Sequence, residues 1–330
     1  MTSRFQSEAE LATGSPTILV CLVNWNGRHH LEYALPSLLA TQHSSLEIMV
    51  VDNASKDGSV EYVRATFSQV RVVENATNFM WAAGNNVGVR IAMEEGHDWV
   101  MLANNDILVD PQWAKIGMRV AQLDRRIGVI GYHVIGKSSR VDVREWRRAL
   151  GDFPGLAFKD DPAIAGCFMM VRREVFEAVG LFDETYQLYG EENDFVARAI
   201  KAGFRAVRCN FPIWHCCEGT ARKVPLFTAY MATRNELRFY VKQHHLSLFG
   251  MLWWFCYRMF VACDIRRSVD LRDSYKRRMH PTRNIFLNGS LVLRAFWWNL
   301  VRLRQTRSAG LADEKRCAAF RAQAQKQHSG

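Results

Sequence analysis

Carboxylates and amides directly follow two apolar runs of the sequence. Asp52-Asn53 comes after the run 46–51, and Asn104-Asn105-Asp106 comes after the run 100–103. Buried strands that end on such residues bring acceptor oxygens to one edge of a sheet, where open α/β folds bind ligands and where a divalent cation can be held. Turns use the same residue types. Because the pattern occurs twice, we predict a binding site at this edge.

Three carboxylates within four residues form a second candidate group, Glu191, Glu192 and Asp194. Such a cluster is often a solvated helix start that the helix dipole favours. Alternatively, a carboxylate that faces a cleft can act as a general base, because like-charged neighbours raise its proton affinity. His215 ends the apolar run 212–214, where it is either a structural residue or, beside a metal-binding aspartate, an imidazole ligand.

Small residues and amides dominate the segment 75–88, which includes Asn85. Small residues let a helix N-terminus approach a ligand, and its free N–H groups would favour a diphosphate. Tight packing of a helix on a sheet through residues 82–84 explains the same composition. Both readings stay open at this point.

Strands and helices alternate through the first two thirds of the chain, which predicts an α/β fold with a mainly parallel sheet flanked by helices. The polar stretch 136–161 is predicted to be an insertion or a loop. The predicted strands are 17–23, 46–51, 70–73, 99–103, 128–131 and 205–209, and the predicted helices are 31–39, 59–67, 82–94, 113–122, 173–179 and the segment that ends at 202.

The positive charge of the chain lies in its last third. The formal net charge is +10, and residues 221–330 hold 21 Lys and Arg against 6 Asp and Glu. The eight cysteines form no CxxC pair and no zinc-type spacing, which indicates reduced thiols in a cytosolic protein. Residues 1–15 are polar, and we expect a flexible N-terminus without a secretory signal.

Two apolar and aromatic segments, 246–263 and 291–304, interrupt this basic region. Arg258 lies within the first segment and would add about 2.5–3.5 kcal/mol near the centre of a bilayer, so attachment at the interface is easier than crossing. Basic residues at 266–267, 276–278 and 283 would attract anionic lipid. We therefore predict a helical, membrane-associating extension, with packing on the catalytic domain as the alternative.

Taken in order, these motifs resemble the family 2 glycosyltransferases of the GT-A fold, in particular their rhamnosyltransferase-like branch. The resemblance covers roughly residues 16–240 and implies a catalytic domain over 16–240 and an extension over 241–330. The matching stretches are Val23–Gly27, Val51–Ser59, Asn85–Gly88, Leu102–Asp106, Arg172–Glu184 and Gly190–Phe195.

The resemblance implies a donor site for a nucleoside-diphosphate sugar, possibly dTDP-rhamnose, and a Mg²⁺ or Mn²⁺ ion. It implies an inverting hexosyltransferase that acts on a saccharide or lipid-linked acceptor in cell-surface polysaccharide synthesis. Glu192 matches the proposed base of the acidic motif, with Glu191 and Asp194 beside it. Asp106 and His215 match metal ligands, and the nucleotide-sugar contacts correspond to Asn24, Asn26, Asp52, Asn53, Asn85, Asn104 and Asn105.

Three positions depart from the pattern of the family. Asn104 is a neutral residue at the first position of the metal motif, and Glu192 is one methylene longer than the usual aspartate. Phe79-Met80-Trp81 is bulkier than the small residues expected beside the donor. The last departure leaves the sugar open.

Other classes of protein fit the sequence less well. A nucleotidyltransferase that makes the activated sugar would carry a Gly-rich basic loop where this chain has Asn24–Gly27, and a dinucleotide dehydrogenase would show GxGxxG there. Nucleic-acid binding would use the basic, aromatic last third, but no motif supports it. We expect an enzyme at the inner face of the cell membrane, attached peripherally from the cytoplasm.

Overall fold

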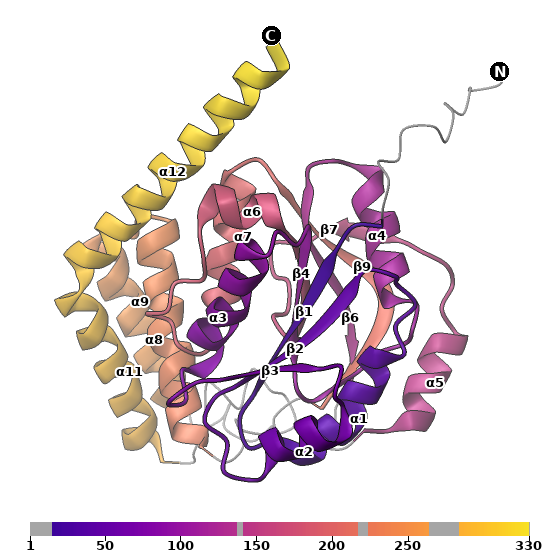
Figure 1. Ribbon diagram of the computed structural model, residues 1–330. Coiled ribbons are helices and arrows are strands. Elements are labelled where there is room, and N and C mark those ends of the chain that lie inside the picture. The colour runs from indigo at the N-terminus through magenta and orange to yellow at the C-terminus, as the bar shows by residue number, and fades with distance from the viewer. Residues whose placement is uncertain (1–14, 137–140, 217–223, 264–283, 330) are drawn as a thin grey trace.

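A mixed sheet forms the centre of the protein (Figure 1). The computed structural model describes residues 15–136, 141–216, 224–263 and 284–329, so the predicted flexible residues 1–14 and the basic residues 266–267, 276–278 and 283 lie outside the described residues. Strands β1, β2, β3 and β4 pair in parallel, β6 pairs in parallel with β9, and β8 is antiparallel to both of its neighbours. Across the sheet the order is β3 (Arg71–Glu74), β2 (Leu46–Asp52), β1 (Ile18–Asn24), β4 (Trp99–Asn104), β8 (Phe168–Arg172), β6 (Ile127–Ile135), β9 (Arg205–His215) and β5 (Ile107–Leu108), with β7 (Phe158–Asp160) also paired with β9.

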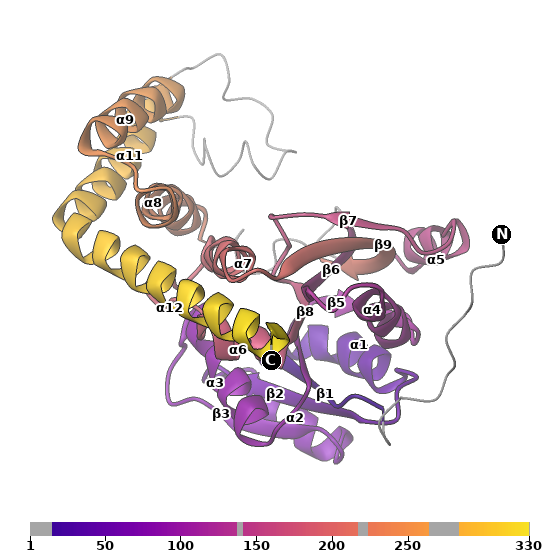
Figure 2. The ribbon, with the colours of Figure 1, turned by 90° about the horizontal axis from the view of Figure 1, so that it is seen from above.

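Helices cover both faces of this sheet (Figure 2). The central strands are buried on both sides, which explains why they are continuous apolar runs and not alternating ones. One face packs on α1 (Arg28–Leu39), α2 (Ser59–Thr66) and α4 (Trp113–Leu123), and the other packs on α3 (Met80–Glu94), α6 (Arg173–Val179) and α7 (Glu191–Lys201).

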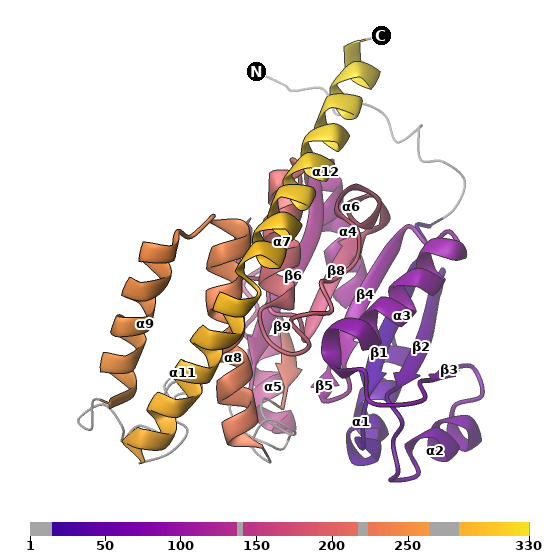
Figure 3. The same ribbon diagram turned by 90° about the vertical axis from the view of Figure 1, so that its left-hand side faces the viewer.

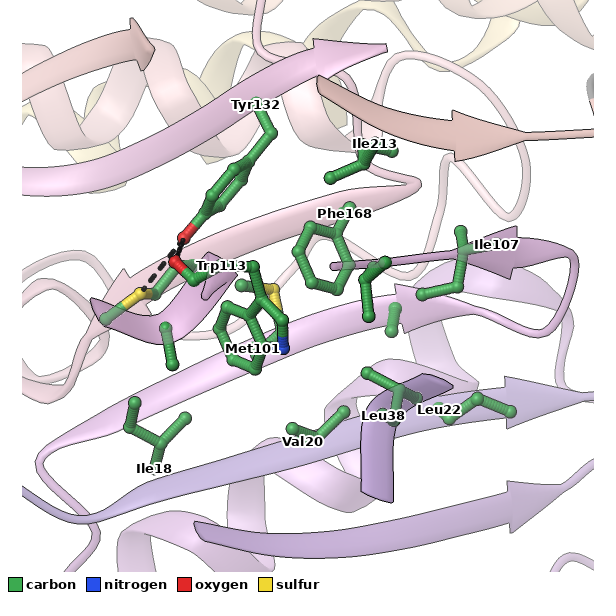
Figure 4. Packing of buried hydrophobic residues seen from close by; sticks show 14 of the residues in the cluster. Ile18, Val20, Leu22, Leu38, Met101, Ile107, Trp113, Tyr132, Phe168 and Ile213 are labelled. Atoms are coloured by element: carbon green, nitrogen blue, oxygen red, sulfur yellow. Dashed lines mark hydrogen bonds between the residues drawn. The ribbon is translucent and has the colours of Figure 1, made fainter. Parts of the chain in front are cut away.

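Aromatic side chains fill the core between α4 and the sheet (Figure 4). The ring of Trp113 meets Phe168 edge-on at 5.1 Å between centroids, and Phe168 meets Tyr132 at the same separation. The Tyr132 hydroxyl donates to the backbone carbonyl of Trp113 at 3.0 Å, so the buried polar group is satisfied. This packing fixes β8 beneath α4.

The structure corrects the prediction of a loop at 136–161. Its described part contains α5 (Val143–Gly151) and the short strand β7. Asp142 caps α5 by accepting from the N–H groups of Arg144 and Glu145. α5 carries apolar residues at helical spacing, Val143, Trp146 and Leu150, and Leu150 packs against the core although no residue of the helix is fully buried. The short strand β7 is held by backbone pairing with β9.

The described residues of the C-terminal region, 224–263 and 284–329, form the helices α8, α9, α11 and α12 (Figure 3). α8 (Pro225–Gln243), α9 (Leu248–Cys263) and α11 (Ile285–Val301) share a small core that includes Leu237, Trp254 and Val292. α12 (Leu303–Ser329) then runs back along α6 and α7, where Cys317 joins the core between these helices and the sheet. The predicted boundary at residue 240 falls inside the continuous helix α8, and the division into domains stays a prediction.

Arg258 lies on the inner side of α9. Its guanidinium pairs with Glu236 of α8 at 3.1 Å, donates to Thr233 and stacks on Trp254 at 5.6 Å from the ring centroid. The segment 246–263 therefore packs on α8 through one side. No helix in the described ranges has both the length and the apolar character to cross a bilayer.

We predict that Gly88→Ala lowers the free energy of unfolding by about 1–3 kcal/mol, because a Cβ at Gly88 would overlap the sulfur of Cys21 on β1. Gly151→Ala is the matched control, since a Cβ there meets nothing within 4 Å. The free energy of unfolding of the control variant should equal that of the parent protein or exceed it by up to about 1 kcal/mol. Urea unfolding of both variants measures the difference, and equal values would contradict the packing described for α3 and β1.

Candidate active site

Polar residues at the ends of β1, β2 and β4 meet at the carboxyl edge of the sheet. Strand register places Asn24 beside Asp52, and Val23 beside Asn104. The Asn24 amide donates to an Asp52 carboxylate oxygen at 2.9 Å, and the Asn105 amide donates to the Asn24 oxygen at 2.7 Å. The strand ends predicted from sequence therefore converge, because neighbouring parallel strands end at the same edge.

The loops after β1 and β2 hold each other by hydrogen bonds. The N–H of Asn26 donates to the Ser55 hydroxyl at 2.8 Å, and the N–H of Lys56 donates to the Asn26 side chain at 2.7 Å. Asp52 accepts the N–H of Ser55 at 2.8 Å through its second oxygen. Asp52 and Asn26 are thus held in fixed positions at this edge of the sheet.

Asp106 and His215 form a close pair where β4 leads into β5. The His215 Nε2 lies 3.0 Å from an Asp106 oxygen, and β5 brings Ile107 opposite His215. Burial alone would raise the pKa of Asp106, but the charge of His215 outweighs it and the pKa is lowered. Burial opposes protonation of His215, yet Cys167 and Asp106 raise its pKa well above the usual value. An imidazolium here balances the buried carboxylate.

A carboxylate and an imidazole at this spacing fit a divalent cation, since both are common ligands. Asn104 is a weaker candidate ligand of the cation, because its oxygen already accepts from the indole N–H of Trp81 at 3.0 Å. The amide nitrogen of Asn104 lies 3.2 Å from the His215 Nε2. A bound cation would take its other ligands from a diphosphate and water. Asp106 and His215 thus fit a metal ion whose remaining coordination positions are filled by the bound diphosphate and by water.

A different group of carboxylates and imidazole lies at the opposite end of β2. Glu47, Glu95 and His97 have potential ligand atoms within 4.8 Å of one another. Arg71 pairs with Glu95 at 2.6 Å and lies 3.7 Å from Glu47. This group is therefore a surface ion-pair network, and it is separate from the polar residues at the carboxyl edge of the sheet.

The acidic cluster at the start of α7 divides into three environments. Asp194 is fully buried and pairs with Arg198 and Lys242, each at 2.9 Å. Burial would raise the pKa of Asp194, but these two cations lower it. Such contacts favour a structural role for Asp194 over the catalytic role suggested by the sequence.

Glu191 is also buried, and one of its oxygens has no hydrogen-bond partner among the described residues. Burial, and then the charge of Glu192, raise the pKa of Glu191 well above the usual range. Both effects favour the neutral form of the Glu191 carboxyl group. Its environment does not suit the predicted part in proton transfer with a substrate.

Glu192 lines a cavity of about 730 Å³ between α7 and α8. One carboxylate oxygen accepts the N–H of Gly190 at 3.2 Å. The walls are largely aromatic and aliphatic, and polar groups stand at intervals among them. They include Tyr189, Ala197, Ile200, Asn235, Glu236, Phe239, Tyr240 and Arg258.

The dipeptide Gly166-Cys167 connects Glu192 with the strand ends. The N–H of Asn104 donates to the Cys167 carbonyl at 2.9 Å. A Cβ on Gly166 would lie 2.9 Å from the ring of Trp81 and 3.6 Å from the Cβ of Glu192. Glu192 and the end of β4 therefore border the same short segment, with the indole of Trp81 between them.

The start of α3 is less open than predicted. The N–H groups of Trp81 and Ala82 point to the Gln187 carbonyl, at 3.2 and 3.4 Å. Asn85 is buried and donates to the Trp81 carbonyl at 2.9 Å. Asn53 is buried as well and donates to the Met80 carbonyl at 3.1 Å. These contacts favour the alternative of tight helix packing for Asn53 and Asn85.

Sequence reasoning missed the residues that separate the two sides of the site. Trp81 attracted attention only for its bulk, and Gly166 carried no signal. Phe239 and Tyr240 of the cavity wall lie in an ordinary amphipathic stretch. Only the contact between distant segments reveals their position.

Comparison with known proteins supports the resemblance noted in the sequence. Residues 19–180 match the sequence model of glycosyl transferase family 2. An N-acetylglucosaminyl-diphospho-decaprenol L-rhamnosyltransferase of Mycobacterium tuberculosis is 26% identical over 220 residues, which cover 57% of this chain and 72% of that protein. The low-salt glycan biosynthesis hexosyltransferase Agl10 of Haloferax volcanii is 24% identical over 177 residues, which cover 49% of this chain and 56% of that protein. An uncharacterized protein of M. tuberculosis is 26% identical over 191 residues, with 54% and 66% covered, so the match spans about two thirds of such relatives.

Two solved structures share the fold. GalNAc-T7 with UDP, GalNAc and Mn²⁺ superimposes with a TM-score of 0.54 at 15% identity, covering 88% of this chain and 58% of that chain. A mannosyltransferase of Pyrobaculum calidifontis with GDP-Man and Mn²⁺ gives a TM-score of 0.51 at 14% identity, covering 95% and 91%. The predicted α/β fold of GT-A type, with a helical C-terminal extension, is confirmed.

We predict that Glu191→Gln stabilises the protein at neutral pH. Because the pKa of Glu191 is raised in the folded state, the parent protein loses stability as the pH rises above the unfolded value of about 4.3. An amide does not ionise, so the variant avoids this loss, and the two proteins should converge below about pH 4. Urea unfolding between these pH values measures the effect. A variant that is less stable at neutral pH would show that the folded state needs an ionised Glu191.

Proposed function

From the match of residues 19–180 to glycosyl transferase family 2 and the GT-A fold, we propose that this protein is an inverting glycosyltransferase. It would move a sugar from a nucleoside-diphosphate sugar to a hydroxyl group of a saccharide or lipid-linked saccharide. The observation that carries the proposal is the position of Glu192, which borders a separate cavity and lies across Gly166 and Trp81 from the polar strand ends. Donor and acceptor would approach from these two sides.

The strand ends supply the donor side. Asp52 and the loop around Asn26 would contact the ribose and base, because their oxygens lie on a rim that hydrogen bonds already hold rigid. Asn105 and Asn104 would border the diphosphate. A rhamnosyltransferase among the relatives makes dTDP-rhamnose the first donor to test.

A divalent cation, Mg²⁺ or Mn²⁺, would be held by Asp106 and His215. When bound, it would neutralise negative charge on the leaving diphosphate. In its absence the protonated His215 balances the Asp106 carboxylate. Both solved structures of the same fold are described with Mn²⁺, which supports the proposal.

Glu192 would act as the base of a single displacement. Its carboxylate accepts the proton of the acceptor hydroxyl while that oxygen bonds to the anomeric carbon. The bond between this carbon and the diphosphate oxygen breaks at the same time, and attack from the opposite face inverts the configuration. Gly190 orients the carboxylate through its N–H group.

The cavity beside Glu192 would hold the acceptor. Aromatic rings such as Phe239 and Tyr240 suit the faces of a sugar or an apolar chain, and Asn235 and Arg258 offer hydrogen-bond donors. Two relatives are named for glycan biosynthesis or for a polyprenyl-linked acceptor. We therefore place the protein in cell-surface polysaccharide synthesis with a saccharide or lipid-linked acceptor.

The outer side of α9 supports attachment to the inner face of the cell membrane. Phe249, Trp253 and Phe260 are 80%, 66% and 66% exposed, and the ring of Tyr257 stacks on Trp253 at 5.8 Å. These residues share one helical face, opposite the buried Arg258. Exposed aromatic side chains of this kind insert at the depth of lipid headgroups.

We predict that Glu192→Gln lowers the rate of sugar transfer by about 10²–10⁴-fold, because the amide cannot accept the hydroxyl proton. Nucleotide affinity should change little, since Glu192 lies on the acceptor side. Glu94→Gln is the matched control, an exposed carboxylate at the far end of α3. Release of nucleoside diphosphate measures transfer. Turnover near that of the parent protein would remove Glu192 from the mechanism.

We predict that Asp106→Ala weakens nucleotide binding in the presence of Mg²⁺ or Mn²⁺ by at least about tenfold, or about 1.4 kcal/mol. A panel of nucleotide sugars in a thermal-shift assay, with and without metal, reads this out and identifies the nucleotide. Asp106→Asn serves as a second variant that keeps the shape of the side chain. Unchanged metal-dependent stabilisation in both variants would contradict the metal site.

A further inference from the structure

A second hollow, of about 560 Å³, lies between α8 and α11 and belongs to neither side of the proposed active site. We call it the α8–α11 groove, and define it by Tyr230, Leu293, Arg294, Trp297, Trp298, Val301 and Arg302. Tyr230 faces it from α8, whereas the cavity beside Glu192 is lined by other residues of that helix, such as Ala232 and Glu236.

The α11 wall of the groove has two parallel stripes with a spacing of four residues. Leu293, Trp297 and Val301 form an apolar stripe and are 54%, 64% and 62% exposed. Arg294 and Arg302 flank Trp298 in the adjacent stripe. Residues four apart lie on the same face of a helix, so each stripe is continuous.

The guanidinium groups of the groove rest on aromatic rings. Arg294 lies 5.0 Å from the ring centroid of Tyr230, and Arg302 lies 4.5 Å from that of Trp298. Arg234 lies 4.5 Å from the same Trp298 ring. In the part of the chain that the structure describes, no carboxylate forms an ion pair with Arg294 or Arg302. The groove therefore carries uncompensated positive charge.

The pKa of Arg234, which lies behind the groove, is lowered by burial and by neighbouring arginines. Burial lowers its pKa, and the nearby Arg238 and Arg302 lower it further, although Tyr230 opposes them. Asn299 donates to the Arg234 carbonyl at 2.9 Å and so joins α11 to α8 behind the groove. An anion would find a rigid, preorganised site.

We propose that the α8–α11 groove binds the phosphate of an anionic membrane phospholipid. Arg294 and Arg302 donate to the phosphate oxygens, and the acyl chains lie along Leu293, Trp297 and Val301. Charge complementarity selects an anion, and the exposed apolar stripe beside it selects an amphiphile over a free phosphate. The inference deepens the membrane attachment proposed above and does not require glycosyl transfer.

The test measures binding of the full chain to vesicles by flotation. We expect stronger binding to mixed phosphatidylcholine–phosphatidylglycerol vesicles than to phosphatidylcholine alone. Arg294→Gln with Arg302→Gln should weaken binding to the mixed vesicles by roughly thirtyfold, at about 1 kcal/mol for each arginine, and leave the weak binding to phosphatidylcholine unchanged. Trp297→Ala should weaken binding to both vesicle types.

Lys315→Gln with Lys326→Gln is the matched control, because it removes the same charge from exposed positions of α12. The control should bind mixed vesicles within a few-fold of the parent protein. Equal losses in both double variants would show non-specific attraction and overturn the groove. Unchanged melting temperatures would show that both variants are folded.

Two further measurements distinguish a lipid phosphate from a soluble anion, and binding in the groove from attachment through α9. Competition by inorganic phosphate or a random oligonucleotide, if it abolished vesicle binding at low concentration, would overturn a lipid site in favour of a soluble anion or nucleic acid. Binding that is equal on neutral and anionic vesicles would overturn the groove and keep attachment through α9. Loss of sugar transfer in Glu192→Gln with normal vesicle binding separates this inference from the proposed activity.

Discussion

The buried ion pairs of Asp194 hold α7, the helix that carries Glu192, in place. Lys242 of α8 bridges Asp194 to Asp183 at 2.9 Å and to Asp313 of α12 at 3.0 Å. Removing one partner of such a network leaves an uncompensated buried charge, at a cost of about 3–5 kcal/mol. Glu192 precedes Asp194 by two residues, so its position depends on helices from the last third of the chain. The C-terminal region is therefore a structural part of the site.

The sequence predicted the elements whose stabilising contacts leave a local pattern. β1, β2 and β4 are buried on both faces and read as apolar runs with polar ends. α5 and β7 escaped prediction, because α5 is a short, mostly charged helix with no fully buried residue and β7 is held by backbone pairing with β9. For β9, the continuation to His215 follows a shift of register against β6, and no single-strand pattern encodes it.

The sequence predicts those parts of the candidate site whose proximity follows from strand topology alone. Parallel strands end at one edge, so Asn24, Asp52 and Asn105 had to be neighbours. What each polar group binds was not predictable, since its partner comes from elsewhere in the chain. The Gln187 carbonyl takes the first N–H groups of α3, and Trp81 takes the oxygen of Asn104. Both contacts occupy polar atoms that the sequence alone had left available for the donor.

One residue connects the cavity beside Glu192 with the outer helices. Arg258 holds α9 to α8 through Glu236, and both side chains also line the cavity beside Glu192. The opposite face of α9 exposes the aromatic residues proposed to meet lipid. An acceptor that hangs from a membrane lipid would therefore need to travel only past α9 to reach the base. Arg258, whose charge makes a bilayer crossing costly, is thus a polar group of the cavity proposed to hold the acceptor.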